Sequence, residues 1–333
     1  MLEQTTAILM KVKRMLNLKE VLQEAKSVAI LGHIRPDGDC IGSCLSLYNY
    51  IETYFPNIEA KVYLQDFMPE FLMLKNADKI EHDYSEDKVY DVCFSLDSAD
   101  KARHGEYVKY FDTAKKTIGI DHHISNQGFA EEHLIISDAS ATAEIMSELI
   151  GKENLTKDIA ECLYLGIAHD TGVFQYSNAS PKTFRVVADL LETGIEASRI
   201  IDETFYQKSY VQNQILGRTL MESIMLMDDK VIVGAVKLKD MEFYGVTPKA
   251  LDGIVSQLRY TRGVEVAIFL YELEPQRYKI SMRSNGKVDV SKVAGYFGGG
   301  GHVKAAGCEM SGNFYDVVNN LTLHIEAQLQ ENA

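Results

Sequence analysis

Three short apolar segments, each followed by acidic or histidine side chains, constrain the fold of this chain more than any other feature of its sequence. The segments cover residues 27–31, 89–96 and 117–120. The polar side chains that follow them are His33, Asp37, Asp39, Asp97, Asp121, His122 and His123. Short apolar runs bounded by turn residues are typical of buried strands in a parallel sheet, and open α/β sheets bind ligands at the carboxyl ends of such strands. We therefore expect these polar residues to meet at one edge of a single sheet.

The order of strand and helix patterns predicts two α/β domains. Strands and helices alternate up to about residue 190, which is typical of a doubly wound domain with a mainly parallel sheet. A polar helical pattern follows, and the strand patterns beyond it predict a second, smaller α/β domain. A chain of 333 residues also suits two domains. We expect a first domain over residues 1–195, a helical linker over 196–222 and a second domain over 223–333, with the active site in the cleft between the two domains.

The balance of charges limits the class of substrate. The chain has 48 acidic and 34 basic residues, a net charge of −14, and its Lys and Arg residues form no basic run. Proteins that bind long nucleic acids usually present a basic face, because the release of counterions drives this binding. We therefore expect no face for long nucleic acid, and a small or short phosphorylated substrate held by metal ions and a few placed cations.

The sequence also bears on the compartment. No apolar run approaches the roughly 20 residues of a membrane span. Residues 1–26 have the pattern of an amphipathic helix and lack the apolar core and cleavage site of a signal peptide. The five cysteines are odd in number and form no CxxC pair, which indicates free thiols in a reducing compartment. We expect a cytoplasmic protein that does not bind a membrane.

The residues after the three strands, together with Asp170, form a candidate metal site. Clustered carboxylates raise one another's pKa values unless a cation lies among them. Carboxylates with one or two imidazoles suit Mn²⁺, Mg²⁺ or similar ions, and two such ions that share a carboxylate make the two-metal site of phosphoryl-transfer hydrolases. Alternatively, each Asp is a helix N-cap or, at Asp170-Thr171-Gly172, part of a turn. Three strand ends of the same design favour the metal site.

A second candidate site lies in the second domain, around the glycine-rich stretch 298–307. Its candidate residues are Arg283, Ser284, Gly299, Gly300, Gly301 and His302. Consecutive glycines let backbone N–H groups approach a phosphate, and a guanidinium can bind it through two hydrogen bonds. A plain loop is the alternative explanation of such a glycine run. Among the other histidines, we expect ordinary surface or packing roles for His82, His104, His133 and His324, whereas the role of His169 stays undecided.

These motifs resemble those of the DHH phosphoesterase superfamily. The likeness to its four motifs, in order, rests on His33-x₃-Asp37-x-Asp39, Asp97, Asp121-His122-His123 and Asp170. The glycine-rich stretch, with Ala305-Ala306-Gly307, is similar to the signature of the DHH-associated C-terminal domain. In length and domain composition the chain most resembles the bacterial bifunctional nanoRNase (oligoribonuclease)/pAp phosphatase group.

The resemblance implies a role for each matching residue. One metal ion would be bound by His33, Asp37 and Asp97, and the other by Asp39, Asp97, His122 and Asp170, so that Asp97 bridges the two. Asp121 would orient a metal ligand, and His123 would face the scissile phosphate. The candidate residues of the second domain would hold the terminal phosphate or the nucleotide.

The resemblance also implies a reaction. The cofactors would be two divalent ions, Mn²⁺ with Mg²⁺ or Co²⁺ as alternatives, and a metal-activated water would attack phosphorus. The substrates would be short RNA or dinucleotides, which yield nucleoside monophosphates, and pAp, which yields AMP. Three alternatives remain: a pApA or cyclic di-AMP phosphodiesterase, a family II-like inorganic pyrophosphatase, and a catalytically silent nucleotide-binding protein. The Ser-Arg-Lys-Lys-Gln motif of the pyrophosphatases does not occur in the sequence. The sequence leaves open the preferred substrate, the exonuclease polarity, the native metal and whether a homodimer forms.

Overall fold

A computed structural model describes residues 16–331 of the chain. The chain divides into two compact units, with the division between Gln207 and Lys208. Of the N-terminal helix expected over residues 1–26, the first fifteen residues lie outside the described part, and α2 (Leu18–Glu24) is the portion that can be described.

The first unit is built on a five-stranded sheet in which every neighbouring pair of strands is parallel. The strand order is β2-β1-β3-β4-β5. The strands span Ser27–Leu31 (β1), Glu59–Tyr63 (β2), Val92–Leu96 (β3), Thr117–Asp121 (β4) and Glu132–Ile135 (β5). This sheet confirms the predicted α/β class and the three predicted strands that precede the polar residues.

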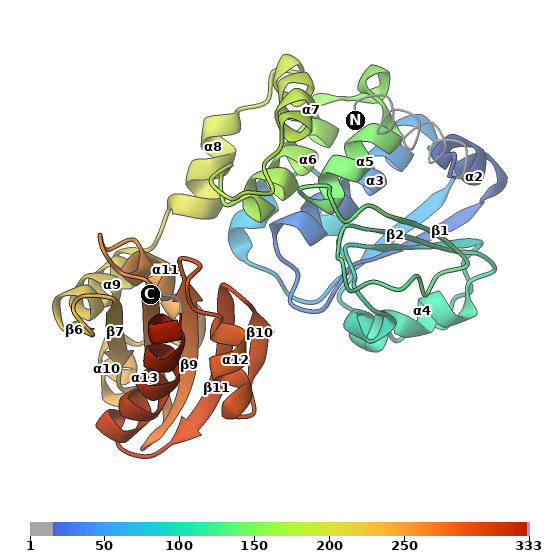
Figure 1. The fold of residues 1–333 in the computed structure, drawn as a ribbon. Coiled ribbons are helices and arrows are strands. Elements are labelled where there is room, and N and C mark those ends of the chain that lie inside the picture. Colours follow the sequence, from blue (N-terminus) through green and yellow to red (C-terminus); the bar gives the residue numbers. More distant parts are fainter. Residues whose placement is uncertain (1–15, 332–333) are drawn as a thin grey trace. The chain divides into compact units, whose positions relative to one another are not determined.

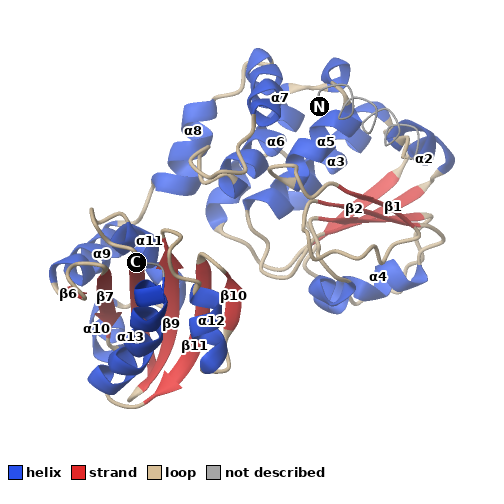
Figure 2. Cartoon of the chain, in the orientation of Figure 1, coloured by secondary structure: helices blue, strands red, loops and turns tan. Residues whose placement is uncertain are grey.

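Helices cover both faces of this sheet, which explains why its three central strands, β1, β3 and β4, are almost entirely buried. The helices are α3 (Gly38–Tyr54), α4 (Val108–Thr113), α5 (Thr142–Ile150), α6 (Lys157–Asp170) and α7 (Pro181–Glu192). Val28 and Ile30 of β1 pack into a core with α3, α5 and α6, whereas Ala29 and Leu31 pack on the α4 side. Figure 2 shows α3 and α5 on one side of the sheet and α4 on the other.

Parallel pairing places the carboxyl ends of β1, β3 and β4 at one edge of the sheet. Leu31 of β1 pairs with Ser95 of β3, and Leu96 of β3 pairs with Ile120 of β4. The loop after β1, the residue after β3 and the end of β4 therefore lie side by side, as the sequence predicts.

The segment predicted as a single connecting helix forms two helices instead. These are α8 (Ala197–Ile201), which continues into a π-helical turn (Asp202–Tyr206), and α9 (Tyr210–Met221). Ser209 begins α9 with a capping box, because its side chain accepts from the N–H of Gln212 while the Gln212 side chain accepts from the N–H of Ser209. The division between the two units falls within the segment 196–222 that was predicted as the linker.

The second unit contains a mixed six-stranded sheet in the order β10-β11-β9-β8-β7-β6 (Figure 1). Only β7 and β8 pair in parallel; the other described pairs are antiparallel. Its strands are β6 (Ile224–Leu226), β7 (Val231–Val236), β8 (Val266–Glu274), β9 (Arg277–Ser284), β10 (Gly300–His302) and β11 (Ala305–Ser311). Its helices after α9 are α10 (Leu238–Tyr244), α11 (Ile254–Arg259), α12 (Val290–Tyr296) and α13 (Phe314–Glu331).

Each face of the second sheet has its own core. Ile268 and Met282 pack with residues of α12 and α13, and Ala267 and Phe269 pack on the opposite face with residues of α9, α10 and α11. Short 3₁₀ helices complete the described chain: Pro69–Met73, Ala77–Lys79, Lys101–Tyr107, Lys152–Asn154 and Pro248–Leu251. Within residues 16–331, no helix has the length and apolar character needed to cross a bilayer. All five cysteines are buried free thiols, which confirms that prediction.

Candidate metal centre

Asp97 lies at the centre of the polar residues that meet at the edge of the first sheet. It directly follows β3, is buried, and has a left-handed backbone conformation with φ of 54°. One carboxylate oxygen, Oδ2, lies 3.4 Å from Nε2 of His33. The other, Oδ1, lies 3.7 Å from Nε2 of His122 and 3.6 Å from Nδ1 of His123. The two oxygens thus face two different histidine groups, which is the arrangement of a carboxylate that can bridge two cations.

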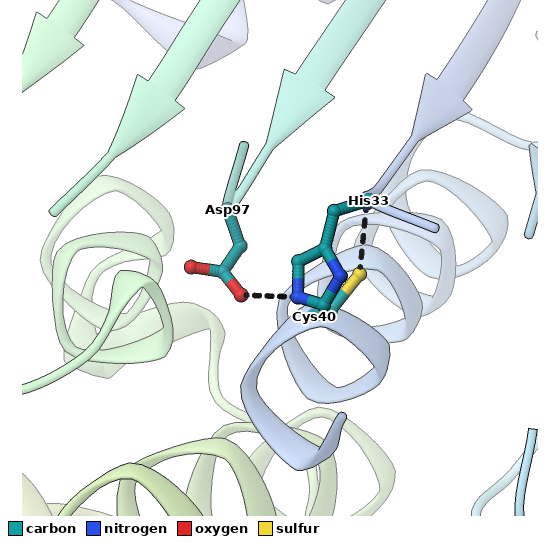
Figure 3. A group of neighbouring side chains, drawn as sticks. All are labelled: His33, Cys40 and Asp97. Carbon is teal, nitrogen blue, oxygen red and sulfur yellow. Dashed lines mark hydrogen bonds and ion pairs between the residues drawn. The ribbon is translucent and has the colours of Figure 1, made fainter. Parts of the chain in front are cut away.

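The first group contains His33, Asp37 and Asp97, with Cys40 beneath them. Asp37 caps the N-terminus of α3 through the N–H of Cys40, and its Oδ1 lies 3.6 Å from Nε2 of His33. The backbone N–H of His33 donates to Sγ of Cys40 at 3.3 Å. Figure 3 shows the His33 ring joined to Asp97 on one side and its backbone joined to Cys40 on the other. The ligand atoms of His33, Cys40 and Asp97 lie within 4.8 Å of one another.

The second group contains Asp39, His122 and Asp170, whose ligand atoms also lie within 4.8 Å of one another. Nε2 of His122 is 3.4 Å from Oδ2 of Asp170 and 3.9 Å from Oδ2 of Asp39. Asp39 comes from the first turn of α3 and Asp170 is the last residue of α6. Asp170 therefore joins the site, although the alternative of a simple turn residue was open.

The carboxylates of these groups fit the chemistry of divalent cations. Burial, together with Asp97 and Asp170, raises the pKa of Asp39 well above its usual value. Burial also raises the pKa of Asp170 to about 6, against the effect of His122. Burial opposes ionisation of Asp37 as well, but its contacts with His33 lower its pKa to about 2. Oxygen-rich sites in which acids repel one another are stabilised by a positive ion among them.

The acids of the site also raise the pKa values of two histidines, His33 and His123. Burial lowers the pKa of His33, but Cys40, Asp37 and Asp97 outweigh this effect and raise it to about 12. The hydrogen bond to Asp121 is the main cause that raises the pKa of His123. Both imidazoles therefore lie in a strongly negative environment.

Asp121 directly precedes His122 and His123, and both of its carboxylate oxygens accept hydrogen bonds from groups of the protein. Its Oδ1 accepts from the N–H groups of His122 and His123, at 2.8 and 3.2 Å, and lies 2.7 Å from Nδ1 of His123. Its Oδ2 accepts from the amide of Asn126 at 2.7 Å. Burial opposes ionisation of Asp121, but these hydrogen bonds lower its pKa overall. Asp121 thus fixes the backbone and ring of the histidines that follow it.

Three polar residues of this site had no signal in the sequence. Thr142 and Ser43 donate to Asp97 and Asp39 respectively, and Asn126 donates to Asp121. Thr142 is 103 residues from Asp39, so no local spacing relates the two. Cys40 was treated only as a free thiol, and its contact with the His33 backbone was not anticipated.

Two other histidines have structural roles. His104, expected to be ordinary, is fully buried, with Nδ1 3.0 Å from the carbonyl of Gly32 and Nε2 3.0 Å from Oγ of Ser95. His104 thus links Gly32, at the end of β1, to Ser95 of β3, directly before His33. The undecided His169 lies 2.9 Å from Oγ1 of Thr204 through its Nε2 and packs its ring against aromatic neighbours.

The glycine-rich stretch of the second unit is an edge strand rather than a loop. Gly301 pairs with Ala306 and His302 with Ala305, so that β10 and β11 form a hairpin. A Cβ atom on Gly299 would lie 2.2 Å from the carbonyl oxygen of Gly307. Gly301 has a φ of 145°, and a Cβ there would lie 2.5 Å from the carbonyl oxygen of Ala305. These two glycines are therefore required by the close approach of the two strands.

Strand register places Arg283 and His302 on one face of the second sheet. Arg283 pairs with Ala305, which pairs in turn with His302, and residues opposite one another project from the same face. Gly300 pairs with Gly307 in the next row on that face. Gly300, Ala305 and Gly307 therefore form a surface of very small residues, here called the floor of the second sheet. The Arg283 guanidinium borders this floor on one side and the His302 imidazole on the other.

Ser284 lies apart from this floor. It is buried on the opposite face, its hydroxyl donates to Oε1 of Glu265 at 3.1 Å, and it accepts from the N–H of Gly286 at 3.0 Å. These two hydrogen bonds hold the Ser284 hydroxyl at the end of β9.

The comparisons with known proteins agree with this geometry. Residues 27–167 match the model of the DHH family, N-terminal domain, and residues 228–331 match the DHHA1 domain. The chain is 32% identical over 310 residues to a bifunctional oligoribonuclease and PAP phosphatase NrnA of Thermus thermophilus, with 90% of this chain and 89% of the relative covered. It is 25% identical over 284 residues to the protein of the same name from Bacillus subtilis, with coverage of 84% and 87%. The crystal structure of an exopolyphosphatase-related protein from Bacteroides fragilis has the same fold, with a TM-score of 0.86, 24% identity, and coverage of 94% of this chain and 96% of that chain.

Proposed function

This chain belongs to the DHH family of phosphoesterases, and from that premise we propose that it hydrolyses short oligoribonucleotides and dinucleotides to nucleoside monophosphates, and pAp to AMP, with two divalent metal ions. The observation that carries the proposal is the position of Asp97, whose two carboxylate oxygens face His33 on one side and His122 on the other. The choice of substrates rests on the names of the relatives from Thermus thermophilus and Bacillus subtilis.

The candidate ligands divide into two sets that share Asp97. His33, Asp37 and Asp97 form the first set. The second set is Asp39, Asp97, His122 and Asp170. When bound, two divalent ions supply a water activated for attack and offset the charge of the phosphate. Carboxylates with imidazoles favour Mn²⁺, with Mg²⁺ or Co²⁺ as alternatives.

His123 is the proposed general acid beside this centre. Its Nδ1 is 2.7 Å from Asp121, which fixes the ring and raises the pKa of the imidazole. The side chain is partly exposed, unlike those of Asp97 and Asp121. With Nδ1 held by Asp121, Nε2 is the atom that delivers a proton to the leaving ribose oxygen, as a general acid does.

Residues of the second unit hold the terminal phosphate or the nucleotide in this proposal. Arg283 and His302 border the floor formed by Gly300, Ala305 and Gly307, and β10 is an edge strand whose residues are exposed. A guanidinium binds phosphate oxygens in pairs, and an edge strand offers backbone N–H groups. Gly299 and Gly301 keep the hairpin closed. Ser284 is left out, because its hydroxyl is used within the protein.

The test is hydrolysis of pAp, pApA, a short RNA, cyclic di-AMP and pyrophosphate, each with Mn²⁺ and with EDTA. The proposal expects Mn²⁺-dependent release of AMP from pAp and of nucleoside monophosphates from the short RNA, and no hydrolysis in EDTA. Hydrolysis confined to pApA or cyclic di-AMP contradicts the proposed substrates but keeps the metal chemistry. Hydrolysis of pyrophosphate alone indicates a pyrophosphatase, and tight nucleotide binding without any hydrolysis indicates a silent binding protein.

A further inference from the structure

The N-terminus of α5 is capped by a residue that is distant in the sequence. Ala141 is the N-cap residue and has no polar side chain. Instead, Oδ2 of Asp39 accepts from the N–H of Thr142 at 2.6 Å, and Oδ1 accepts from the N–H of Ala143 at 2.9 Å. The first N–H groups of a helix need such acceptors, and the positive end of the helix dipole favours a carboxylate there. The first turn of α3 and the N-terminus of α5 are thus held together through Asp39.

Thr142 makes a second bond that helix capping does not require. Its hydroxyl donates to Oδ1 of Asp97 at 3.0 Å. One residue therefore holds two carboxylates that come from separate parts of the chain, the start of α3 and the end of β3. All three residues are buried, so water does not compete for these bonds. Helix capping alone would be complete with the backbone N–H groups.

These hydrogen bonds fix the orientation of the carboxylate oxygens of Asp97 and Asp39. The hydroxyl of Thr142 occupies one lone pair of Oδ1 on Asp97, while Oδ2 of the same carboxylate points to His33. Ser43, one turn along α3, donates to Oδ1 of Asp39 at 3.2 Å and fixes that carboxylate from the other side. Hydrogen-bonded partners of this kind orient metal ligands and tune their affinity.

We propose that Thr142 is a positioning residue that holds Asp39 and Asp97 in the one geometry in which both can bind metal ions. This inference rests on the metal centre proposed above. It assigns the two bonds of Thr142 different tasks: the backbone N–H fixes Asp39, and the hydroxyl fixes the carboxylate shared by both ligand sets.

The decisive variant is Thr142→Val, which keeps the shape of the side chain and the backbone N–H but removes the hydroxyl. We expect its affinity for Mn²⁺, measured by calorimetric titration of the EDTA-treated and dialysed full chain, to fall by about 10–100-fold, the usual effect of losing such a partner. Thr142→Ser restores the hydroxyl and should restore the affinity. Thr219→Val is the matched control, because Thr219 is a buried helical threonine of the second unit whose hydroxyl donates to the carbonyl of Ile215.

Ser43→Ala separates the two ligand sets. Its bond touches only Asp39, so we expect weaker binding of one of the two ions, whereas Thr142→Val weakens both because it acts on Asp97. The ratio of bound Mn²⁺ per chain, counted from the titration or from electron paramagnetic resonance of free Mn²⁺, distinguishes these patterns.

Each outcome has a defined meaning. If wild-type protein binds no Mn²⁺, the proposed metal centre itself fails. If the wild type, Thr142→Val and Thr142→Ser all bind two ions with the same affinity, the positioning role is wrong and the proposed function stands. Circular dichroism checks the folding of each variant. If Thr142→Val does not fold, Thr142→Ala, which also removes the hydroxyl, takes its place.

Discussion

The proposed metal centre of the first unit and the proposed phosphate site of the second unit are built from different kinds of residues. The edge of the first sheet brings carboxylates and imidazoles together, and the buried carboxylates of Asp39 and Asp121 each accept several hydrogen bonds. The floor of the second sheet is made of glycine and alanine backbone, with one guanidinium and one imidazole beside it. Charge lies deep in the first site and near the solvent in the second.

The difference has a physical reason. A metal ion needs oxygen and nitrogen atoms held at fixed separations, and acids in such a cluster repel one another until a cation arrives. A phosphate on a flexible nucleotide needs only donors that it can approach closely. The first site should therefore control catalytic rate and metal affinity, and the second should control substrate affinity. The predictions below test that division, from the largest expected effect to the smallest.

Replacing Asp97 with Asn should cause the largest loss. The change removes the charge that both ligand sets share and keeps a residue type that tolerates the left-handed backbone at this position. We expect kcat for short RNA to fall by at least about 10²–10³-fold, the scale reported for a single electrostatic contact in an active site. The measurement is steady-state hydrolysis with saturating Mn²⁺.

The control is Asp91→Asn at the opposite end of the same sheet. Asp91 accepts from the N–H groups of Lys26 and Ser27 and pairs with Lys115, which together lower its pKa to about 2. This variant should lose some stability and keep its activity. Equal losses of kcat in both variants would show that charge at the carboxyl edge has no special role.

Replacing Arg283 with Ala should raise KM and leave metal affinity unchanged. Loss of a hydrogen bond to a charged group costs roughly 1.5–3 kcal/mol, so we expect KM for short RNA to rise about 10–100-fold. Arg277→Ala on the same strand is the control, because Arg277 forms surface ion pairs with Glu274 and Glu309. A fall in kcat with an unchanged KM would break the proposed division of labour between the two sites.

Two glycines of the hairpin should respond differently to alanine. Gly301→Ala places a Cβ against backbone and puts an L-residue at a positive φ, so we expect a loss of stability of about 1–3 kcal/mol. Gly300→Ala meets no described heavy atom within 4 Å of the new Cβ and should change stability little. Urea unfolding of both variants measures the contrast, and equal midpoints would show that the close approach of the two strands at Gly301 does not limit stability.

The sequence predicted the metal centre best, because its acids and histidines directly follow recognisable strands. The acids and histidines after β1, β3 and β4 were predicted to meet because parallel neighbours end at one edge. The glycine run was ambiguous, since glycine has no strand propensity and fits a loop equally well. The break before α9 had a usable signal in Ser209 and Gln212, the capping box that begins this helix. Thr142 could not be found, because only the fold brings it to Asp39 and Asp97.

The last prediction concerns the pH dependence of stability after the metal has been removed with EDTA. Burial raises the pKa of Asp170 from 3.8 to about 6, so between these two pH values the folded chain holds a proton that the unfolded chain has released. Stability from this group therefore falls as pH rises through that window, by at most about 1.4 kcal/mol per pH unit. Asp39 contributes in the same direction, since its pKa is also raised.

Urea unfolding of the EDTA-treated protein across this window measures the slope, and Asp170→Asn should reduce it. Asp37 does not mask the effect, because its pKa is lowered to about 2 and its stabilising contribution is lost only below the window. Added Mn²⁺ should reverse the trend, since a bound cation favours the ionised carboxylates and protons compete with it. In the second unit burial also raises the pKa of Asp252, against the effects of Lys208 and Arg283, so this carboxyl adds to the slope independently of the metal centre. A slope that Asp170→Asn and Mn²⁺ both fail to alter would place the titrating groups outside the metal centre, and the contrast between the two sites would then rest on geometry alone.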